Sequence, residues 1–151
     1  MKRKNIFRYI ILPLFIIMTV VCWYVYSEYN RSHKDTENLQ PDYSLHAAEL
    51  IKEFSGDEQA SNKKYWDKVI AVNGVVKEKK PDEDGVYTIA LGDTADMSSV
   101  RCSIDSVHNR AAINVIKGAT VTIKGICTGF TADELLGSDV FLVRCVIETH
   151  K

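Results

Sequence analysis

Cysteine is the residue type in this chain whose chemistry and placement are most informative. Cys102, Cys127 and Cys145 each follow the alternating phase of the apolar residues around them. That phase predicts three side chains that point into a protein core from three β-strands. Buried thiols act as small hydrophobic groups, or two of them form a disulfide where the compartment is oxidising.

The same residues are poorly spaced for metal binding or catalysis. The three cysteines are separated by 25 and 18 residues, without the Cys-x-x-Cys pair typical of structural zinc sites. The four histidines are scattered without a paired spacing: His33, His46, His108 and His150. The acidic turn at 82–85 lacks the alternating ligands and terminal glutamate of a calcium loop. Sequence motifs for a nucleophile elbow, a phosphate loop or a dinucleotide site are absent. We therefore expect no catalytic residues, no cofactor and no metal.

A helical pattern precedes the cysteine-bearing segments. Ser44 is placed to cap a helix that ends at Gly56. Its apolar stripe has helical spacing and consists of Ala47, Leu50, Ile51 and Phe54. A short second helical segment at 57–66 is expected to bring Tyr65 and Trp66 against the core.

Five β-strands follow, predicted over residues 68–79, 86–91, 99–104, 119–128 and 139–148. Gly74 within the first strand indicates a bulge or sharp bend. A helix at 106–117 separates the third and fourth strands, with Val107, Ala111, Ile113 or Asn114, and Val115 on its inner side. This order, β-β-β-α-β-β after an initial helix, is typical of the five-stranded OB-fold barrel, an all-β fold with accessory helices. A small sandwich is the alternative.

Several spaced residues in this region resemble a known family. They are Glu58-x-Ala60, Tyr65, Lys68, Val72-x-Gly74-x-Val76, Val100-x-Cys102, Gly118-x-x-Val121, Gly125-x-Cys127 and Val140-x-Leu142-x-x-Cys145. The pattern, over about residues 45–147, is similar to the tRNA-anticodon-like (tRNA_anti-like) OB-fold proteins. That resemblance implies an anchored or lipoprotein-like bacterial protein of unassigned function. The chain departs from the family at Trp66-Asp67, where a small residue or glycine is frequent. Fold resemblance alone does not give function.

The OB topology narrows the options for the cysteines. The fifth strand of such a barrel neighbours both the third and the fourth, so Cys145 can meet Cys102 or Cys127. Sequence does not fix the connectivity. Three buried hydrophobic thiols and a Cys127–Cys145 disulfide both remain open.

A candidate ligand face follows from the strand phases. The outward positions of the second and third strands are Thr88, Ala90, Arg101 and Ser103. Two rim loops, expected at 77–85 and 129–138, flank this face, and OB folds bind ligands with such loops. The second loop contributes Phe130, Leu135 and Leu136 to this face; its leucines alternatively cap the barrel end.

An apolar segment lies at the N-terminus. Residues 9–26 carry no charge over 18 positions, near the lower limit for a membrane-spanning helix. The basic residues Lys2, Arg3, Lys4 and Arg8 precede it, which predicts a cytoplasmic N-terminus and an extracytoplasmic domain. A cleaved signal peptide or lipidation at Cys22 is the alternative. The expected organisation is a basic N-terminus at 1–8, an anchor at 9–26, a polar linker at 27–43 and the OB domain at 44–151.

Charge bears on the choice of partner. The first 26 residues hold four of the 19 basic and none of the 20 acidic residues, which leaves 15 against 20, a net charge of -5. Nucleic-acid binding depends on basic groups that neutralise phosphates, so nucleic acid is the secondary prediction. The primary prediction is a single-pass, membrane-anchored extracytoplasmic binding or scaffolding module without catalysis, on the periplasmic side in a bacterium with two membranes. Its expected partners are the membrane and an envelope protein, glycan or small molecule.

Overall fold

The structure, a computed structural model, describes residues 18–24, 26, 36–133 and 137–148. The chain divides into two compact units, Met1–His33 and Lys34–Lys151. In the first unit, residues 18–24 and 26 are helical. The described residues include no helix long and apolar enough to cross a bilayer. Most of the predicted span, residues 9–17 and 25, lies outside the described part of the chain.

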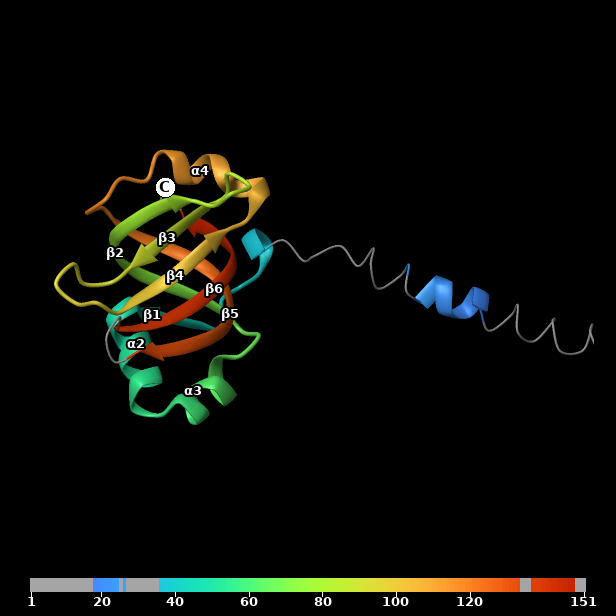
Figure 1. Cartoon of the computed structure of the whole chain (residues 1–151), viewed down its shortest axis with the longest axis horizontal. Coiled ribbons are helices and arrows are strands. Elements are labelled where there is room, and N and C mark those ends of the chain that lie inside the picture. Colours follow the sequence, from blue (N-terminus) through green and yellow to red (C-terminus); the bar gives the residue numbers. More distant parts are fainter. Residues whose placement is uncertain (1–17, 25, 27–35, 134–136, 149–151) are drawn as a thin grey trace, which may run out of the picture. The chain divides into compact units, whose positions relative to one another are not determined.

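Five strands of the second unit form a closed ring (Figure 1). They are β2 (Val69–Pro81), β3 (Tyr87–Leu91), β4 (Ser99–Ile104), β5 (Thr120–Asp133) and β6 (Gly137–Glu148). The neighbour order is β2-β3-β4-β6-β5, and β5 pairs back onto β2. Only β4 and β6 run parallel within this ring. A mostly β architecture with a closed strand ring is consistent with the OB-type fold that the sequence predicts.

The barrel interior is filled by the inward residues of each strand. Ile89, Val100, Cys102, Cys127 and Cys145 are all buried, which confirms the strand phases predicted for them. One face of α2 (Ala47–Gly56) completes the core. The apolar stripe predicted for this helix is buried as expected and comprises Ala47, Leu50, Ile51 and Phe54.

The start of α2 differs from the prediction. Ser44 does not cap the helix, because residues Tyr43–His46 form strand β1, which pairs in parallel with β2. His46 takes the cap position and makes no side-chain hydrogen bond there. The sequence missed β1 because it is short and leads directly into the helix.

Helix α3 (Glu58–Tyr65) places one of its two predicted core aromatics inside. Tyr65 is fully buried, as predicted. The prediction for Trp66 is wrong, because its side chain is 58% exposed. The helix ends at Trp66, and Asp67 adopts a left-handed backbone with φ of 58°. The helix therefore ends before Trp66 can pack against the core, and the chain turns at Asp67.

The helix predicted at 106–117 is much shorter. It consists of a 3-10 turn, η2 (Ser106–His108), and α4 (Asn109–Ile113). Ala112 and Val115 face the barrel, and the burial of Val115 was predicted. The other predicted inner positions are exposed, namely Val107, Ala111 and both Ile113 and Asn114. The Lys79 ammonium donates to the carbonyls of Ala112 and Ile113 at 3.1 and 3.0 Å. It thereby gives hydrogen-bond partners to carbonyls at the C-terminal end of this short helix.

The segment predicted as a rim loop at 129–138 is instead a β-hairpin. The end of β5 pairs with the start of β6 from Gly129↔Phe141 to Asp133↔Gly137. Residues 134–136 alone separate the strands, and Leu135 and Leu136 lie outside the described residues. Glycine and small polar residues led to a loop prediction, but cross-strand pairing continues the ladder through them.

Gly74 has a packing role and is not a bulge. A Cβ at this position would lie 3.0 Å from the Cβ of Ala47 and 3.2 Å from that of Leu91, so the glycine lets α2 approach β2. The irregularity in β2 falls later, between Val76 and Glu78.

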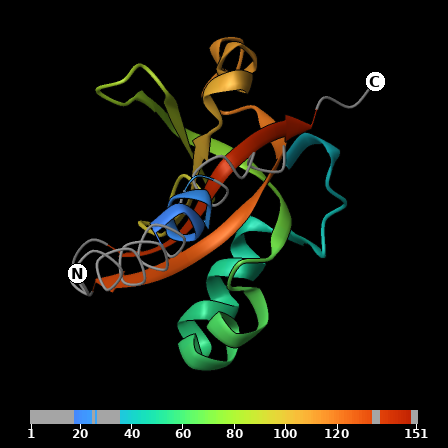
Figure 2. The same ribbon diagram turned by 90° about the vertical axis from the view of Figure 1, so that its right-hand side faces the viewer.

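The end of the predicted linker packs on the barrel. Residues Thr36–Asn38 form a 3-10 turn, η1, in which Thr36 is buried. The buried Lys124 ammonium donates to the Glu37 carbonyl at 3.0 Å. Figure 2 shows η1 on the flank of the barrel, with α2 and α3 at one end and α4 at the other. The folded domain thus begins near Thr36, eight residues before the predicted boundary.

Candidate ligand-binding face

The four strand residues predicted for the ligand face lie side by side. Thr88 pairs with Ser103, and Ala90 pairs with Arg101, across the antiparallel β3–β4 ladder. Directly paired residues point to the same side of a sheet. These positions therefore share the outer side of the sheet, opposite Ile89 and Cys102. Arg101 is exposed there, while the small Ala90 side chain is largely covered.

Strand β2 borders this face and completes a shallow depression of about 260 Å³. Its lining residues are Glu78, Lys80, Pro81, Asp82, Thr88, Ala90 and Arg101. Lys80 and Glu78 form an ion pair at 2.8 Å. The hydrogen bond from Lys80 lowers the pKa of the Glu78 carboxyl. The depression thus holds charges of both signs.

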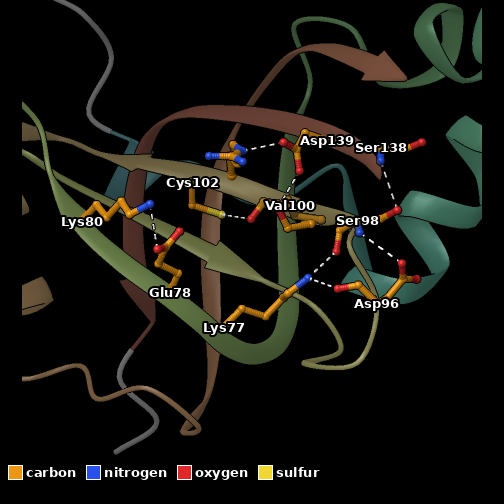
Figure 3. A network of polar contacts seen from close by, with 11 residues as sticks. Lys77, Glu78, Lys80, Asp96, Ser98, Val100, Cys102, Ser138 and Asp139 are labelled. Carbon is orange, nitrogen blue, oxygen red and sulfur yellow. Dashed lines mark hydrogen bonds and ion pairs between the residues drawn. The ribbon is translucent and has the colours of Figure 1, made fainter. Parts of the chain in front are cut away.

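Arg101 is oriented by Asp139 from the neighbouring strand β6, and Figure 3 labels this carboxylate. Its Nε donates to Asp139 Oδ2 at 2.6 Å, and Ser99 Oγ donates to Asp139 Oδ1 at 2.6 Å. A guanidinium carries five N–H donors, and this ion pair uses the one at Nε. Arg101 is therefore held in position while its charge is balanced by a carboxylate.

Two aromatic side chains that the sequence analysis did not include extend the face. Arg101 pairs with Phe141, and Phe141 pairs with Gly129. Phe141 is 36% exposed. A Cβ at Gly129 would lie 3.8 Å from Trp66 Cζ3, so the exposed indole of Trp66 lies beside this glycine. We call Ala90, Arg101, Phe141, Gly129 and Trp66 the Arg101 row.

The sequence contained a signal for one of these aromatics. Phe141 lies between the inward residues Val140 and Leu142, so strand alternation alone places it outward. Trp66 carried no such signal, because its position depends on the turn at Asp67.

Phe130 belongs to the barrel end and not to the ligand face. Its ring stacks on Phe54 with centroids 5.2 Å apart and planes 20° from parallel. It packs as a partly buried residue against the core. Phe130 thus has the capping position that the sequence analysis considered only for the leucines of this segment.

The lysines next to the face support the protein's own backbone. Lys77 donates to the carbonyls of Asp96 and Ser98 at 2.5 and 2.8 Å. Lys79 donates to the end of α4 as described above. Both ammonium groups are thus engaged in ordering loops and helix ends, so these two lysines do not form a basic groove.

A polar network fixes the rim of the barrel between β3 and β4 (Figure 3). The backbone N–H of Ser98 donates to Asp96 Oδ1 at 3.1 Å, and this bond lowers the pKa of Asp96. Ser98 Oγ accepts from the backbone N–H of Ser138 at 3.1 Å. The loop between β3 and β4 is therefore hydrogen-bonded to the β5–β6 hairpin, on the same side as Arg101 and Asp139.

The three core cysteines are free thiols in the structure. Burial raises the pKa of Cys127 and Cys145, which favours the protonated thiol. A Cys127–Cys145 disulfide stays a prediction. Within the described residues, no cluster of three or more His, Cys, Asp or Glu side chains is arranged to hold a metal ion.

Comparison with solved structures places this fold among known proteins. One match is a proposed nucleic acid-binding lipoprotein from Klebsiella pneumoniae subsp. pneumoniae MGH 78578, with a TM-score of 0.54 and 16% identity over 70% of this chain and 91% of that chain. OBody AM3L09 bound to hen egg-white lysozyme gives a TM-score of 0.43 and 17% identity over 58% and 88%. Entamoeba histolytica asparaginyl-tRNA synthetase gives 0.38 and 10% over 56% and 21%.

No curated protein sequence matches this chain. The family model tRNA_anti-like matches residues 1–147, nearly the full length. Most of the residues that suggested this family from the sequence lie in the strands of the closed ring, while Glu58, Ala60 and Tyr65 lie in α3. The chain therefore belongs to the tRNA_anti-like family.

Proposed function

We propose that this chain is a membrane-anchored extracytoplasmic binding module that performs no catalysis. Residues 9–26 form the anchor, and the barrel from Thr36 onward presents the Arg101 row to a partner in the cell envelope. The uncharged N-terminal segment and the basic residues before it support the anchor and its orientation. The lipoprotein neighbour in the structure comparison fits a membrane context.

The observation that carries the binding function is the composition of the Arg101 row. Exposed indole and phenyl rings lie on either side of a small residue, Gly129, and continue to a fixed guanidinium. Aromatic rings supply apolar contact area, and arginine supplies directed hydrogen bonds. These are the residue types enriched at the energetic centres of binding surfaces.

The row favours an uncharged or mixed-charge partner. Asp139 balances Arg101 at 2.6 Å, and Lys80 is paired with Glu78 in the adjacent depression. A glycan, a small molecule with a ring, or an envelope protein offers flat apolar surface and hydrogen-bonding groups without demanding a positive field. We place a neutral glycan first, because sugar rings stack on exposed aromatics and their hydroxyls bond to arginine and aspartate.

Single-stranded nucleic acid is the second candidate, and Trp66 with Phe141 is the observation in its favour. Bases stack on exposed aromatics in OB folds, but the same proteins use a positively charged groove. Here Lys77 and Lys79 bind backbone carbonyls and Arg101 is ion-paired. The aromatic side chains on which bases could stack are present, but the positive charge that would attract phosphates is weak.

The first experiment determines the side of the membrane. Two fusions at the C-terminus are compared, one with a reporter active only outside the cytoplasm and one active only inside. We expect an outside signal. An inside signal overturns the proposed orientation and makes nucleic acid the leading candidate.

The second experiment uses Trp66 as a local probe. In a Trp23→Phe background, Trp66 is the remaining tryptophan, so its fluorescence reports on the row. We expect a tetramer of N-acetylglucosamine to shift the emission, and Phe141→Ala to weaken that binding. Val107→Ala is the control, because Val107 is exposed but lies in η2, outside the row. A 12-nucleotide oligouridylate that binds with a strong salt dependence, while the sugar does not bind, supports the second candidate.

A further inference from the structure

The α4 end of the barrel carries a group of exposed aliphatic side chains. Val107, Ile113 and Ile116 are 79%, 57% and 71% exposed. They lie within ten residues of one another, in η2, in α4 and just after it. We call these three residues the α4 tip. Three large aliphatic side chains with this exposure, close together in the sequence at one end of the barrel, make this end a candidate interaction surface.

We infer that the α4 tip docks on the surface of the bilayer in which residues 9–26 are anchored, an inference that rests on the anchor proposed above. The occupant of the tip is therefore lipid. Its contact consists of aliphatic side chains lying among headgroups and upper acyl chains, in the way that interfacial membrane segments bind.

Short elements explain why these residues stay outside the core. One turn of η2 and five residues of α4 cover the end of the barrel. Ala112 and Val115 fill the contact with the core and are buried. Since α4 ends at Ile113, Ile116 follows in the turn that leads to Gly118. The neighbouring aliphatics have no remaining core surface to cover.

The polar linker joins the barrel close to the α4 end. Lys124 holds η1 through the Glu37 carbonyl at 3.0 Å. The Glu37 carboxylate lies 3.8 Å from His108 Nε2, and His108 is the residue after Val107. The domain therefore receives its N-terminal connection beside η2.

Chain length limits how far the domain can move from the membrane. Nine residues, 27–35, connect the anchor to Thr36. Even fully extended, nine residues span only about 30 Å. Because Glu37 in η1 contacts His108 in η2, the linker attaches at the α4 end of the domain, which favours this end over the α3 end for contact with the bilayer. Tethering raises its effective concentration at the surface, so a weak apolar contact is sufficient.

Charge around the tip is mixed, which indicates apolar docking. Arg110 and Lys117 are exposed there. The acidic turn at 82–84 lies at the same end, because Asn109 Nδ2 donates to the Gly85 carbonyl at 2.8 Å. Attraction to anionic headgroups is therefore offset by the acidic side chains. We expect docking on zwitterionic and anionic vesicles alike, with little dependence on salt.

The test places an environment-sensitive fluorophore on the full chain in vesicles. A Cys22→Ser background removes the exposed native thiol, while the other three thiols are buried. A nitrobenzoxadiazole probe is attached at Ile116→Cys, and the chain is reconstituted into phosphatidylcholine vesicles with and without phosphatidylglycerol. We expect a blue-shifted emission, and loss of fluorescence when the lipids carry a doxyl quencher.

The matched control is Gln59→Cys in α3. This exposed position lies at the opposite end of the barrel from α4 (Figures 1 and 2). Its probe is expected to stay in water and escape quenching. Unquenched fluorescence at position 116, or equal quenching at 116 and 59, overturns the docking inference.

Flotation of the vesicles distinguishes a failure of the docking inference from a failure of the proposed anchor on which it rests. A chain that floats with the vesicles and shows a water-exposed probe at position 116 leaves the anchor intact and removes only the docking. A chain that fails to float overturns both. An Ile113→Ser/Ile116→Ser variant, which changes only exposed side chains, is expected to fold normally and still float. In that variant, a probe at Val107→Cys is expected to lose the blue shift that the same probe shows without the serine substitutions.

Discussion

Tyr65 joins the hydrophobic core to a polar cluster at its edge. Its ring meets Tyr43 at 5.0 Å and Phe54 at 5.8 Å between centroids. Its hydroxyl donates to Glu53 Oε2 at 2.8 Å, and Lys64 donates to the same oxygen at 2.9 Å. These two hydrogen bonds lower the pKa of Glu53. A buried aromatic thereby keeps its polar end satisfied.

This cluster predicts a pH dependence of stability. Because the pKa of Glu53 is lowered in the folded state, its contribution is present above the unfolded value of 4.5 and is lost as pH falls through the folded pKa. Glu53→Gln should lower stability at pH 7 by less than about 1 kcal/mol, since the pair is partly exposed. Thermal unfolding between pH 7 and pH 3 measures this. A gap between variant and wild type that fails to narrow at acid pH contradicts the prediction.

A second prediction at this scale concerns Gly125. A Cβ at this position would collide with Cys145 Sγ and would lie 3.2 Å from Leu142 Cβ. We expect Gly125→Ala to destabilise the protein by about 1–3 kcal/mol, the usual effect of overpacking a core. Urea unfolding measures the loss. Gly56→Ala is the control, because nothing lies within 4 Å of its Cβ position, and it should be neutral or slightly stabilising.

At the scale of elements, two residues with capping side chains show that strand pairing, and not local sequence alone, decides where a helix begins. Asp57 begins α3 and accepts a hydrogen bond from the backbone N–H of Ala60 at 2.9 Å. Ser44, which also has a capping side chain, lies instead in β1 and pairs with Ala71. Both residue types favour helix caps, and the parallel pairing with β2 decides between them.

The caps give a direct comparison of two substitutions. Asp57→Ala should cost about 1 kcal/mol, because a backbone N–H at the start of α3 loses its acceptor. Ser44→Ala should change stability by less than about 0.5 kcal/mol, since this exposed side chain caps no helix. Chemical denaturation of both variants measures the difference. A larger loss for Ser44→Ala would contradict the assignment of the caps.

For the whole molecule, the division between the two units is the main feature. The unit Lys34–Lys151 contains the complete strand ring and its core. The ring closes through β2–β5 pairing, and no strand of it comes from the first unit. The folded domain therefore holds its own stabilising contacts.

We expect residues 34–151, produced alone, to fold and unfold in one cooperative transition. Circular dichroism during heating provides the measurement, with the full chain in detergent as reference. The midpoints of the two should agree. A gradual loss of structure in the shorter chain would mean that the first unit contributes to the fold.

The residue pattern alone was enough to predict the strand phases, five of the strands and the family. Side chains alternate along a strand with period two, so the inward placement of Cys102, Cys127 and Cys145 and the outward placement of Arg101 follow from local pattern. Thr88↔Ser103 and Ala90↔Arg101 are paired across β3 and β4, although Ala90 is largely buried. The outward position of Phe141 follows from the same alternation.

Which outward residues become neighbours depends on how the strands assemble into the barrel. Barrel closure brings Phe141 beside Arg101 and Gly129 beside Phe141, and the turn at Asp67 brings Trp66 next to Gly129. Pairing with β6 likewise turned an expected loop into a strand. Local periodicity assigns a residue to a face, but the residues that share that face across strands depend on the register that closes the ring.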